Sequence, residues 1–356
     1  MNWLILALLF LSLSIIAHEL GHFILAKRNG VRVEEFGIGF PPRLIPLARW
    51  EETVFSLNAI PFGGFVKVVG EDDPSIEGGL ASKPKGVRAK VLLAGAGMNL
   101  LLAFTLFTGA FMSGYPSPLY QVKVFGVAPG SPAEAAGIKP GDIILSANGV
   151  NFRTPEELSN YTDKHLGQEI TLQIKRGEEL FTVRLVPRPS PPAGEGPMGV
   201  KIGMAYVKKQ ASPFEALFLS AFSILRAVVL IITIPIQVIS GLLPLAALRP
   251  VGPVGALQVM TDVAEQSSLM GWWFPFLFVS ALLNVALAVS NLLPIPGLDG
   301  GRLLFVAFEA IKGHRIDPRR ESWIHMIGVA ILLILMLVIT FFDIAAPLEE
   351  MEWDLF

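Results

Sequence analysis

The first residues of the chain place two histidines inside an apolar segment. From Leu4 to Ala17 no side chain is charged, and the apolar character resumes from Phe23 to Ala26. About 20 predominantly apolar residues are enough to cross a bilayer as a helix. The pattern therefore predicts a transmembrane helix over residues 1–27. It lacks the basic start of a secretory signal peptide, so we expect it to be retained.

The histidines belong to the sequence His18-Glu19-Leu20-Gly21-His22. Side chains four residues apart share one face of a helix, so the two imidazoles lie about one turn apart. The carboxylate beside the first histidine can then reach a water held between them, which is the H-E-x-x-H arrangement of zinc hydrolases. We therefore predict that His18 and His22 bind a zinc ion and that Glu19 is the catalytic base.

The composition agrees with a membrane location. Of the 356 residues 52% are hydrophobic and only 16% are charged, which indicates a polytopic membrane protein with some soluble mass. The net charge of −2 gives no sign of a nucleic-acid partner. Cysteine is absent, which excludes disulfides and thiolate ligands and leaves histidines and carboxylates as the strong metal ligands.

Residues 31–70 are predicted to form a small membrane-associated β and loop region, because short alternating runs are broken by glycine and proline. Its loops at residues 37–42 and 60–64 are apolar, so they either dip into the membrane face beside the metal site or form a plain juxtamembrane hairpin. A basic linker at 71–90 and a second transmembrane helix at 91–113 follow. Asn99 in that helix bonds another helix or orients the metal site.

One module is clearly soluble, at residues 121–187. Strand patterns flank a predicted helix from Pro155 to His165, and the segment Gly137-Ile138-Lys139-Pro140-Gly141-Asp142 is followed by a tight turn at Asn148-Gly149. This combination resembles a PDZ domain of the bacterial type, and the resemblance implies binding of extended peptides beside a sheet edge. A proline-rich linker and a strand are predicted over residues 188–213.

The third metal ligand is sought in the C-terminal part, where a third transmembrane helix with an L-D-G sequence is predicted over residues 271–301. Pro294 and Pro296 interrupt the helical path, so Asp299 can turn a carboxylate toward the two histidines. The alternative is that Asp299 caps the next helix. An amphipathic helix at 302–313 and a fourth transmembrane helix at 323–342 complete the chain.

The metal site constrains the topology. His22 and Asp299 must lie at the same membrane side, so residues 214–248 have to make an even number of crossings. That segment is short for two helices. We expect an interfacial or re-entrant segment broken between Pro235 and Pro244, and about four transmembrane helices in all. Basic residues gather on the metal side, which the positive-inside rule makes cytoplasmic and which leaves the PDZ domain outside.

Taken together, these motifs resemble the site-2 proteases, intramembrane zinc metalloproteases, of the bacterial PDZ-containing type. The resemblance rests on the H-E-x-x-H sequence, the Phe36 to Val69 region, the PDZ-like module and Asn291 to Gly301, which follows N-x-x-P-x-x-x-L-D-G. Two departures concern a Gly-Pro-x-x-Asn element, in which Ala96 replaces the proline, and a single PDZ domain where the best-known members have two.

The resemblance implies zinc-dependent cleavage of peptide bonds within or near transmembrane segments. Expected substrates are anti-sigma factors or similar proteins, or signal-peptide remnants, first trimmed by a site-1 type protease, at the bacterial inner membrane. The PDZ domain would filter substrates by size or capture the new C-terminus. Candidate substrate-binding residues are Asn291, Pro294, Pro296, Phe65, Val66 and Lys67.

Two other classes of protein fit parts of the pattern. A membrane scaffold would need only the PDZ domain, but the intact set of metal-binding residues argues against a vestigial site. A metal transporter would be expected to carry further intramembrane ligands, whereas His165, His314 and His325 fall in or beside polar segments.

Overall fold

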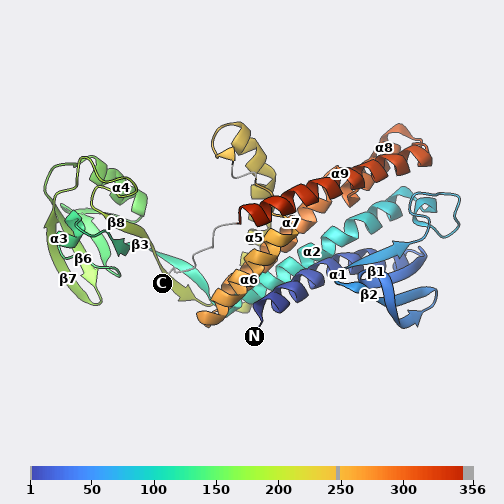
Figure 1. The fold of residues 1–356 in the computed structure, drawn as a ribbon, viewed down its shortest axis with the longest axis horizontal. Coiled ribbons are helices and arrows are strands. Elements are labelled where there is room, and N and C mark those ends of the chain that lie inside the picture. The colour runs from blue at the N-terminus through green and yellow to red at the C-terminus, as the bar shows by residue number, and fades with distance from the viewer. Residues whose placement is uncertain (1, 246–248, 348–356) are drawn as a thin grey trace. The chain divides into compact units, whose positions relative to one another are not determined.

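The computed structural model describes residues 2–245 and 249–347, without the side chains of Pro61 and Phe62. It divides into two compact units, one formed by the residues up to 114 together with those from 210 onward, the other by residues 115–209 (Figure 1). The first unit holds the long apolar helices and the second is the soluble module.

Five helices in the described part of the chain are long and apolar enough to cross a membrane. They are α1 (Trp3–Arg28), α2 (Lys85–Ser113), α5 (Pro213–Ile239), α7 (Phe274–Asn291) and α9 (Pro318–Ala345). About four were expected from the sequence, because residues 214–248 were left out of the count. The second helix was expected to start at residue 91, whereas α2 begins at Lys85. The first turns of α2 are basic, and they precede the apolar residues from which the start of the helix was predicted.

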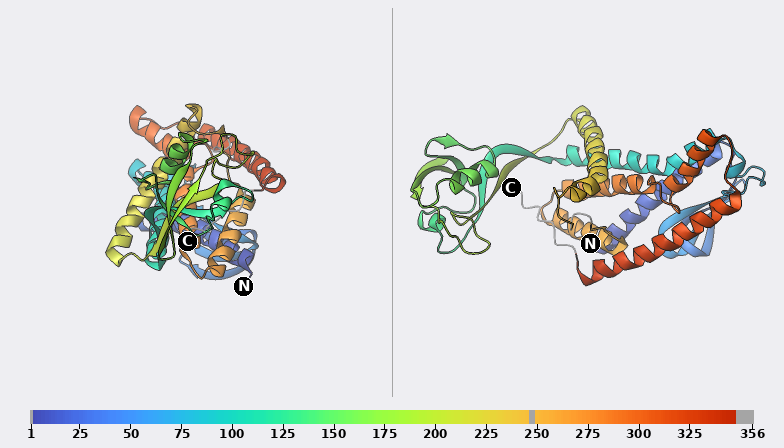
Figure 2. Two further views of the ribbon diagram at one scale, coloured as in Figure 1. Left: turned by 90° about the vertical axis from the view of Figure 1, so that its left-hand side faces the viewer. Right: turned by 90° about the horizontal axis from the view of Figure 1, so that it is seen from above.

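The segment between the soluble module and α7 leaves and returns at the same end of α2. Ala211 N donates to Phe111 O (3.1 Å), and Trp272 Nε1 donates to Gly114 O (2.6 Å). The right-hand view in Figure 2 shows α5, drawn in yellow, at a steep angle to α2 rather than alongside it. A second helix, α6 (Pro253–Leu269), then returns through a stretch to which the sequence analysis assigns no element. The expected even number of crossings by residues 214–248 stays a prediction.

The helix α5 itself differs from the expectation in one respect. It continues through Pro235 and ends at Ile239, with Gly241 at φ +76° just beyond. A proline in the last turns removes only one hydrogen bond, and the helix need not end there. The expected break therefore lies after the proline, inside the predicted stretch.

A small sheet formed by β1 (Val33–Trp50) and β2 (Thr53–Val68) packs beside α1. Residues 33–38 pair with 64–68 on one side and with 54–57 on the other, and residues 45–50 pair with 53–57, so the two folded strands make four rows. The ring of Phe23 on α1 contacts Phe36 and Phe55, each at 5.5 Å between ring centroids. Residues 64–68 form one edge of this sheet, next to the histidines.

The second unit is a six-stranded sheet with two short helices. Its elements are β3 (Tyr115–Val127), α3 (Pro132–Ala135), β4 (Ile143–Ala147), β5 (Val150–Asn151), α4 (Pro155–Asp163), β6 (Ile170–Arg176), β7 (Glu179–Leu185) and β8 (Val200–Lys209). The strand order is β7-β6-β4-β3-β8, with β5 beside β4, and Asn148-Gly149 turns between β4 and β5 with positive φ at both residues, as predicted. We call residues 115–209 the PDZ-like domain.

The PDZ-like domain is longer at both ends than the predicted 121–187. Its last strand, β8, pairs along the whole of β3, from Tyr115 with Lys209 to Val127 with Val200. The strand predicted within 188–213 therefore belongs to this sheet. Pairing between segments so far apart in sequence leaves no local signal.

A loop of residues 71–82 follows the sheet edge and ends in the short 3-10 helix η1 (Leu80–Ser82). It was predicted as part of a linker. Two backbone bonds close its base instead, from Leu80 N to Val69 O (2.9 Å) and from Ala81 N to Gly70 O (2.9 Å). After α7 the chain turns at residues 292–298 and enters α8 (Asp299–Lys312), which corresponds to the predicted amphipathic helix.

Candidate metal centre

The structure brings the three predicted ligands together. Nε2 of His18 and Nε2 of His22 lie 3.1 Å apart, and Oδ2 of Asp299 lies 3.1 Å and 3.2 Å from them. The two histidines are 9% and 7% exposed. Two imidazole nitrogens and one carboxylate oxygen are a donor set typical of catalytic zinc, which keeps a further position open for water.

The other ring nitrogens show how the histidines are oriented. Nδ1 of His22 donates to Val91 O (2.8 Å), so the Nε2 atom of this ring carries a lone pair in the neutral form. Nδ1 of His18 faces the Asn99 amide at 3.5 Å, and the buried Oδ1 of Asn99 has no partner among the described residues. Rotating that amide by 180° makes Oδ1 the acceptor for His18 Nδ1–H. Both Nε2 lone pairs then face each other and a carboxylate, which only a cation between them stabilises.

Glycines on α1 and α2 create the space for this cation. A Cβ at Gly95 would lie 2.3 Å from His22 Nε2 and 2.6 Å from His18 Nε2. On α1, a Cβ at Gly21 would lie 2.2 Å from Ala94 O, so the helices are as close as glycine permits. The cradle beside Gly95 and the converging donors fit zinc.

Asp299 is positioned by the turn between α7 and α8. It is the first residue of α8 and the N-cap position is Leu298, so Asp299 is not the capping residue that the alternative interpretation suggested. Gly297 has φ +100°, which favours glycine, and its N–H donates to His325 Nδ1 (3.1 Å) on α9. A Cβ at Gly328 would lie 2.1 Å from Pro296 O. The last helix thus packs directly against the turn that aims Asp299 at the histidines.

Glu19 lies between the metal ligands and the sheet edge. Its Oε2 accepts a hydrogen bond from Val66 N (3.0 Å). The three ligands and Glu19 line a cavity of about 280 Å³, together with Val66, Val68, Glu71, Leu80, Val91, Leu92, Asn291, Gly297, Leu298 and Arg302. Glu19 can therefore exchange a proton with a water or substrate atom in this cavity.

The six candidate substrate-binding residues fall into two groups. Val66 and Asn291 line the metal cavity. Phe65 instead packs across the sheet toward Gly37, and Lys67 pairs with Glu34 (2.7 Å) on the exposed side. The two prolines shape the turn before Asp299 and are absent from the cavity lining.

Sequence reasoning missed four residues that shape this centre: Gly95, Glu71, Arg302 and His325. Gly95 lies among several small residues of a predicted helix and has no side chain that would mark it as part of a site. Arg302 follows Asp299 by three residues and so shares its helical face, which is a signal that the sequence does contain.

Comparisons with known proteins agree with the centre. Peptidase family M50 matches residues 6–335. A putative zinc metalloprotease of Clostridium perfringens is 34% identical over 348 residues, 97% of this chain and 99% of that protein. The zinc metalloprotease RasP of Geobacillus kaustophilus is 30% identical, covering 92% and 94% of the two chains.

Two further matches concern regulation and the soluble module. The regulator of sigma-W protease RasP of Bacillus subtilis is 28% identical, covering 92% of this chain and 94% of that protein. The solved PDZ domain of an SdrC-like protein from Listeria monocytogenes is 20% identical, covering 26% of this chain and 92% of that one, but its TM-score of 0.20 is too low to support a fold assignment. The family match extends over nearly the whole length, and the chain belongs to peptidase family M50, the site-2 protease type, as a zinc metalloendopeptidase.

Proposed function

We propose that this protein cleaves peptide bonds within or near transmembrane segments of other membrane proteins. The observation that carries the proposal is the position of the metal centre. His18 and His22 lie in the second half of an apolar helix that is long enough to span a bilayer. Asp299 reaches them from the turn after another such helix. A substrate has to approach this centre from the membrane or its surface.

Zinc bound by His18, His22 and Asp299 would act as a Lewis acid that activates a water and polarises the scissile carbonyl. The protein's own contribution to the proton transfer comes from Glu19. Its carboxylate lies in the cavity with the ligands, takes a proton from the attacking water and delivers it to the leaving amine. Asn291, at the end of α7 and on the same cavity wall, is placed to hydrogen-bond the substrate backbone.

The edge formed by residues 64–68 is the proposed docking strand for the substrate. A transmembrane helix has its amides paired internally and must unwind before it can be cut. An exposed sheet edge offers new partners for the released backbone groups. Val66 N–H already points to Glu19, so a strand added here lies beside the catalytic base. Proline substitutions within 65–69 test this role, and unchanged cleavage would contradict it.

The orientation and the biological substrates belong to the same proposal. Basic residues around the metal centre support a location near the cytoplasmic face of the bacterial inner membrane, with the PDZ-like domain outside. A relative named as a regulator of sigma-W protease supports anti-sigma factors or similar signalling proteins as substrates. Such substrates would first be trimmed by a separate protease outside the membrane.

The decisive experiment incubates the purified protein with a helical transmembrane substrate in detergent or vesicles, with Glu19→Gln as the matched inactive variant. We expect cleavage by the parent protein alone, inhibited by a zinc chelator. Equal cleavage by both proteins, or by neither across several transmembrane substrates, would refute the proposed activity.

Removal of the PDZ-like domain tests how substrates are admitted. Deletion of residues 115–209 broadens cleavage to untrimmed substrates if the domain is a size filter. The same deletion abolishes cleavage if the domain captures the trimmed C-terminus.

A further inference from the structure

Arg302 connects the helix that carries Asp299 with the loop that follows the sheet edge. Its Nη2 lies 3.1 Å from Glu71 Oε2 and its Nη1 lies 2.9 Å from Asp72 Oδ1. One guanidinium thus holds two carboxylates that are neighbours in the sequence, an arrangement that exploits its planar fork of donors. We call these three residues the 71–72–302 cluster.

Helix α8, which carries Arg302, is held in position by a contact of its own. At the far end of α8, Glu309 accepts a 2.5 Å bond from Arg88 of α2, and the Arg88 side chain is 6% exposed. Because α2 also carries Gly95 beside the ligands, α8 is tied to the metal centre independently of the loop.

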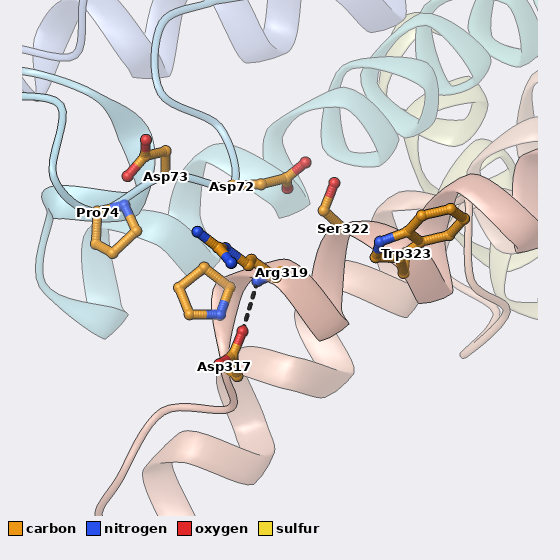
Figure 3. Close-up of a pocket in the computed structure, with 8 residues that line it drawn as sticks. Asp72, Asp73, Pro74, Asp317, Arg319, Ser322 and Trp323 are labelled. Atoms are coloured by element: carbon orange, nitrogen blue, oxygen red, sulfur yellow. Dashed lines mark hydrogen bonds between the residues drawn. The ribbon is translucent and has the colours of Figure 1, made fainter.

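The loop that carries Glu71 and Asp72 is held by other contacts. The loop of residues 71–82 is closed at its base, and Arg315 Nη1 donates to Ala81 O (3.0 Å) at its end. Its first part borders the metal cavity through Glu71 and, on another side, an open cavity of about 660 Å³ against the start of α9. Figure 3 shows Asp72 and Asp73 on this loop opposite Arg319, Ser322 and Trp323. The contacts with Arg302 therefore fix the loop where it borders the metal cavity.

The charges of the 71–72–302 cluster indicate how the loop would move if Arg302 were absent. Glu71 and Asp299 line the same metal cavity, and Asp72 follows Glu71 in the loop, so without Arg302 the carboxylates of Glu71 and Asp72 would lose the positive charge that offsets them. Repulsion would then favour an outward displacement of Glu71 and Asp72 from the closed base of the loop, and this strains the end of the edge strand, since Val68 is joined to Glu71 by only two residues.

We propose that Arg302 is a positioning residue that holds the edge strand of residues 64–68 in register with the metal centre by pairing with Glu71 and Asp72. The inference rests on the proposed function, because it assumes that the substrate docks on this edge. Displacements of about 1 Å between reacting groups lower rates by about 100-fold. Arg302 thus acts through the loop and not on the substrate.

Kinetics of purified variants on a transmembrane substrate test this role. Arg302→Gln and the double variant Glu71→Gln/Asp72→Asn should each lower kcat by about 100-fold with little change in KM. Combining all three substitutions should be no worse than Arg302→Gln alone, because residues in one network are not additive. Lys312→Gln, on the last turn of the same helix, and Asp73→Asn, next to Asp72 in the loop, are the matched controls and should keep parent activity.

Two outcomes would overturn the proposal. If Glu71→Gln/Asp72→Asn keeps full activity while Arg302→Gln is inactive, Arg302 acts on the substrate directly. If Arg302→Gln loses its zinc in parallel with its activity, the effect lies in Asp299 itself. We expect its zinc affinity to fall by less than about 10-fold, below the usual cost of losing a hydrogen-bond partner of a metal ligand.

A thiol reporter gives a readout that does not require catalysis. The chain has no cysteine, and Leu80, which is 3% exposed, lies at the closed base of the loop and lines the metal cavity. In a Leu80→Cys background, Arg302→Gln should make the thiol react several-fold faster with a maleimide, because the loop opens more often. Equal labelling rates would refute the positioning role even if the parent protein cleaved no substrate, which keeps this test separate from that of the proposed function.

Discussion

Substitution of Gly95 by alanine offers a direct test of the metal centre. The new methyl would lie 2.3 Å from His22 Nε2 and 2.6 Å from His18 Nε2, whereas ordinary contacts begin at 3.4 Å. A rotation of helix α2 does not relieve this clash, because the backbone of Ala94 on α2 is already in close contact with Gly21 on α1. The histidine rings therefore have to move by about 1 Å, which far exceeds the roughly 0.2 Å tolerance of metal–ligand distances.

The expected magnitude follows from this displacement. Loss of a mere supporting hydrogen bond costs about 10–100-fold in metal affinity. Moving both nitrogen ligands should cost more than about 100-fold and abolish cleavage. Helix propensity works in the opposite direction, since alanine stabilises a helix by about 1 kcal/mol relative to glycine. A folded protein without zinc is thus the predicted product.

The assay is zinc affinity measured by competition with a chromophoric chelator, together with the thermal unfolding of the purified protein. Gly97→Ala is the matched control, because it lies on the same helix and its Cβ would meet nothing within 4 Å. It should keep the parent's zinc affinity. A Gly95→Ala protein that binds zinc within a few-fold of the parent would refute the assigned geometry.

Three further substitutions have defined outcomes. Asn99→Ala removes the acceptor for the first histidine and should lower zinc affinity by about 10–100-fold. Arg176→Gln should lower the free energy of unfolding of the PDZ-like domain at pH 7 by about 1–3 kcal/mol, because buried Asp142 loses the partner of its carboxylate (2.7 Å). Although burial raises the pKa of Asp142, Arg176 holds it below its usual range, so this difference should shrink as the pH falls through that pKa. Gly328→Ala, whose Cβ would lie 2.1 Å from Pro296 O, should lower cleavage by displacing the turn before the third ligand.

Each of these substitutions has a control elsewhere in the chain or at the same position. Asn99→Asp keeps an acceptor and should retain zinc, and weaker binding than in the alanine variant would contradict the assigned amide orientation. Arg184→Gln breaks an exposed pair at 3.9 Å and should change unfolding by less than about 0.5 kcal/mol. Gly109→Ala adds a methyl at an ordinary 3.7 Å from Leu277 and should leave cleavage unchanged, whereas equal losses at 109 and 328 would argue for a general effect of alanine in these helices.

Local sequence patterns were enough to predict which three side chains converge at the candidate metal centre, and most of the elements. His18 and His22 are fixed by helical spacing, and the prolines before Asp299 predict the turn that redirects it. The H-E-x-x-H pair and Asp299 lie far apart in the chain. Two histidines leave a zinc site short of one protein ligand, however, and this directs the search to a carboxylate elsewhere in the sequence. The helices predicted over 302–313 and 323–342 appear within α8 and α9, with ends extended by polar residues.

Local sequence patterns could not predict contacts between segments that are far apart in the chain. The strand β8 joins the sheet only because it meets β3, and α6 has a mixed composition that marks neither a span nor a soluble face. Gly95 looks like any small residue until the histidine rings are placed beside it. Arg302 likewise resembles the other basic residues of the chain, and only the structure shows that it pairs with Glu71 and Asp72.

The hydrogen bond between Ala211 and Phe111 has a consequence for how the protein is assembled. It brings the end of α2 and the start of α5 together, so the PDZ-like domain is an insertion whose two attachment points are adjacent. Such junctions tolerate exchange, since neither neighbouring helix depends on the inserted chain for its ends. A short glycine-serine bridge should replace the domain without disturbing the helices, and a different recognition module spliced at this point would give the same catalytic body a new choice of substrate.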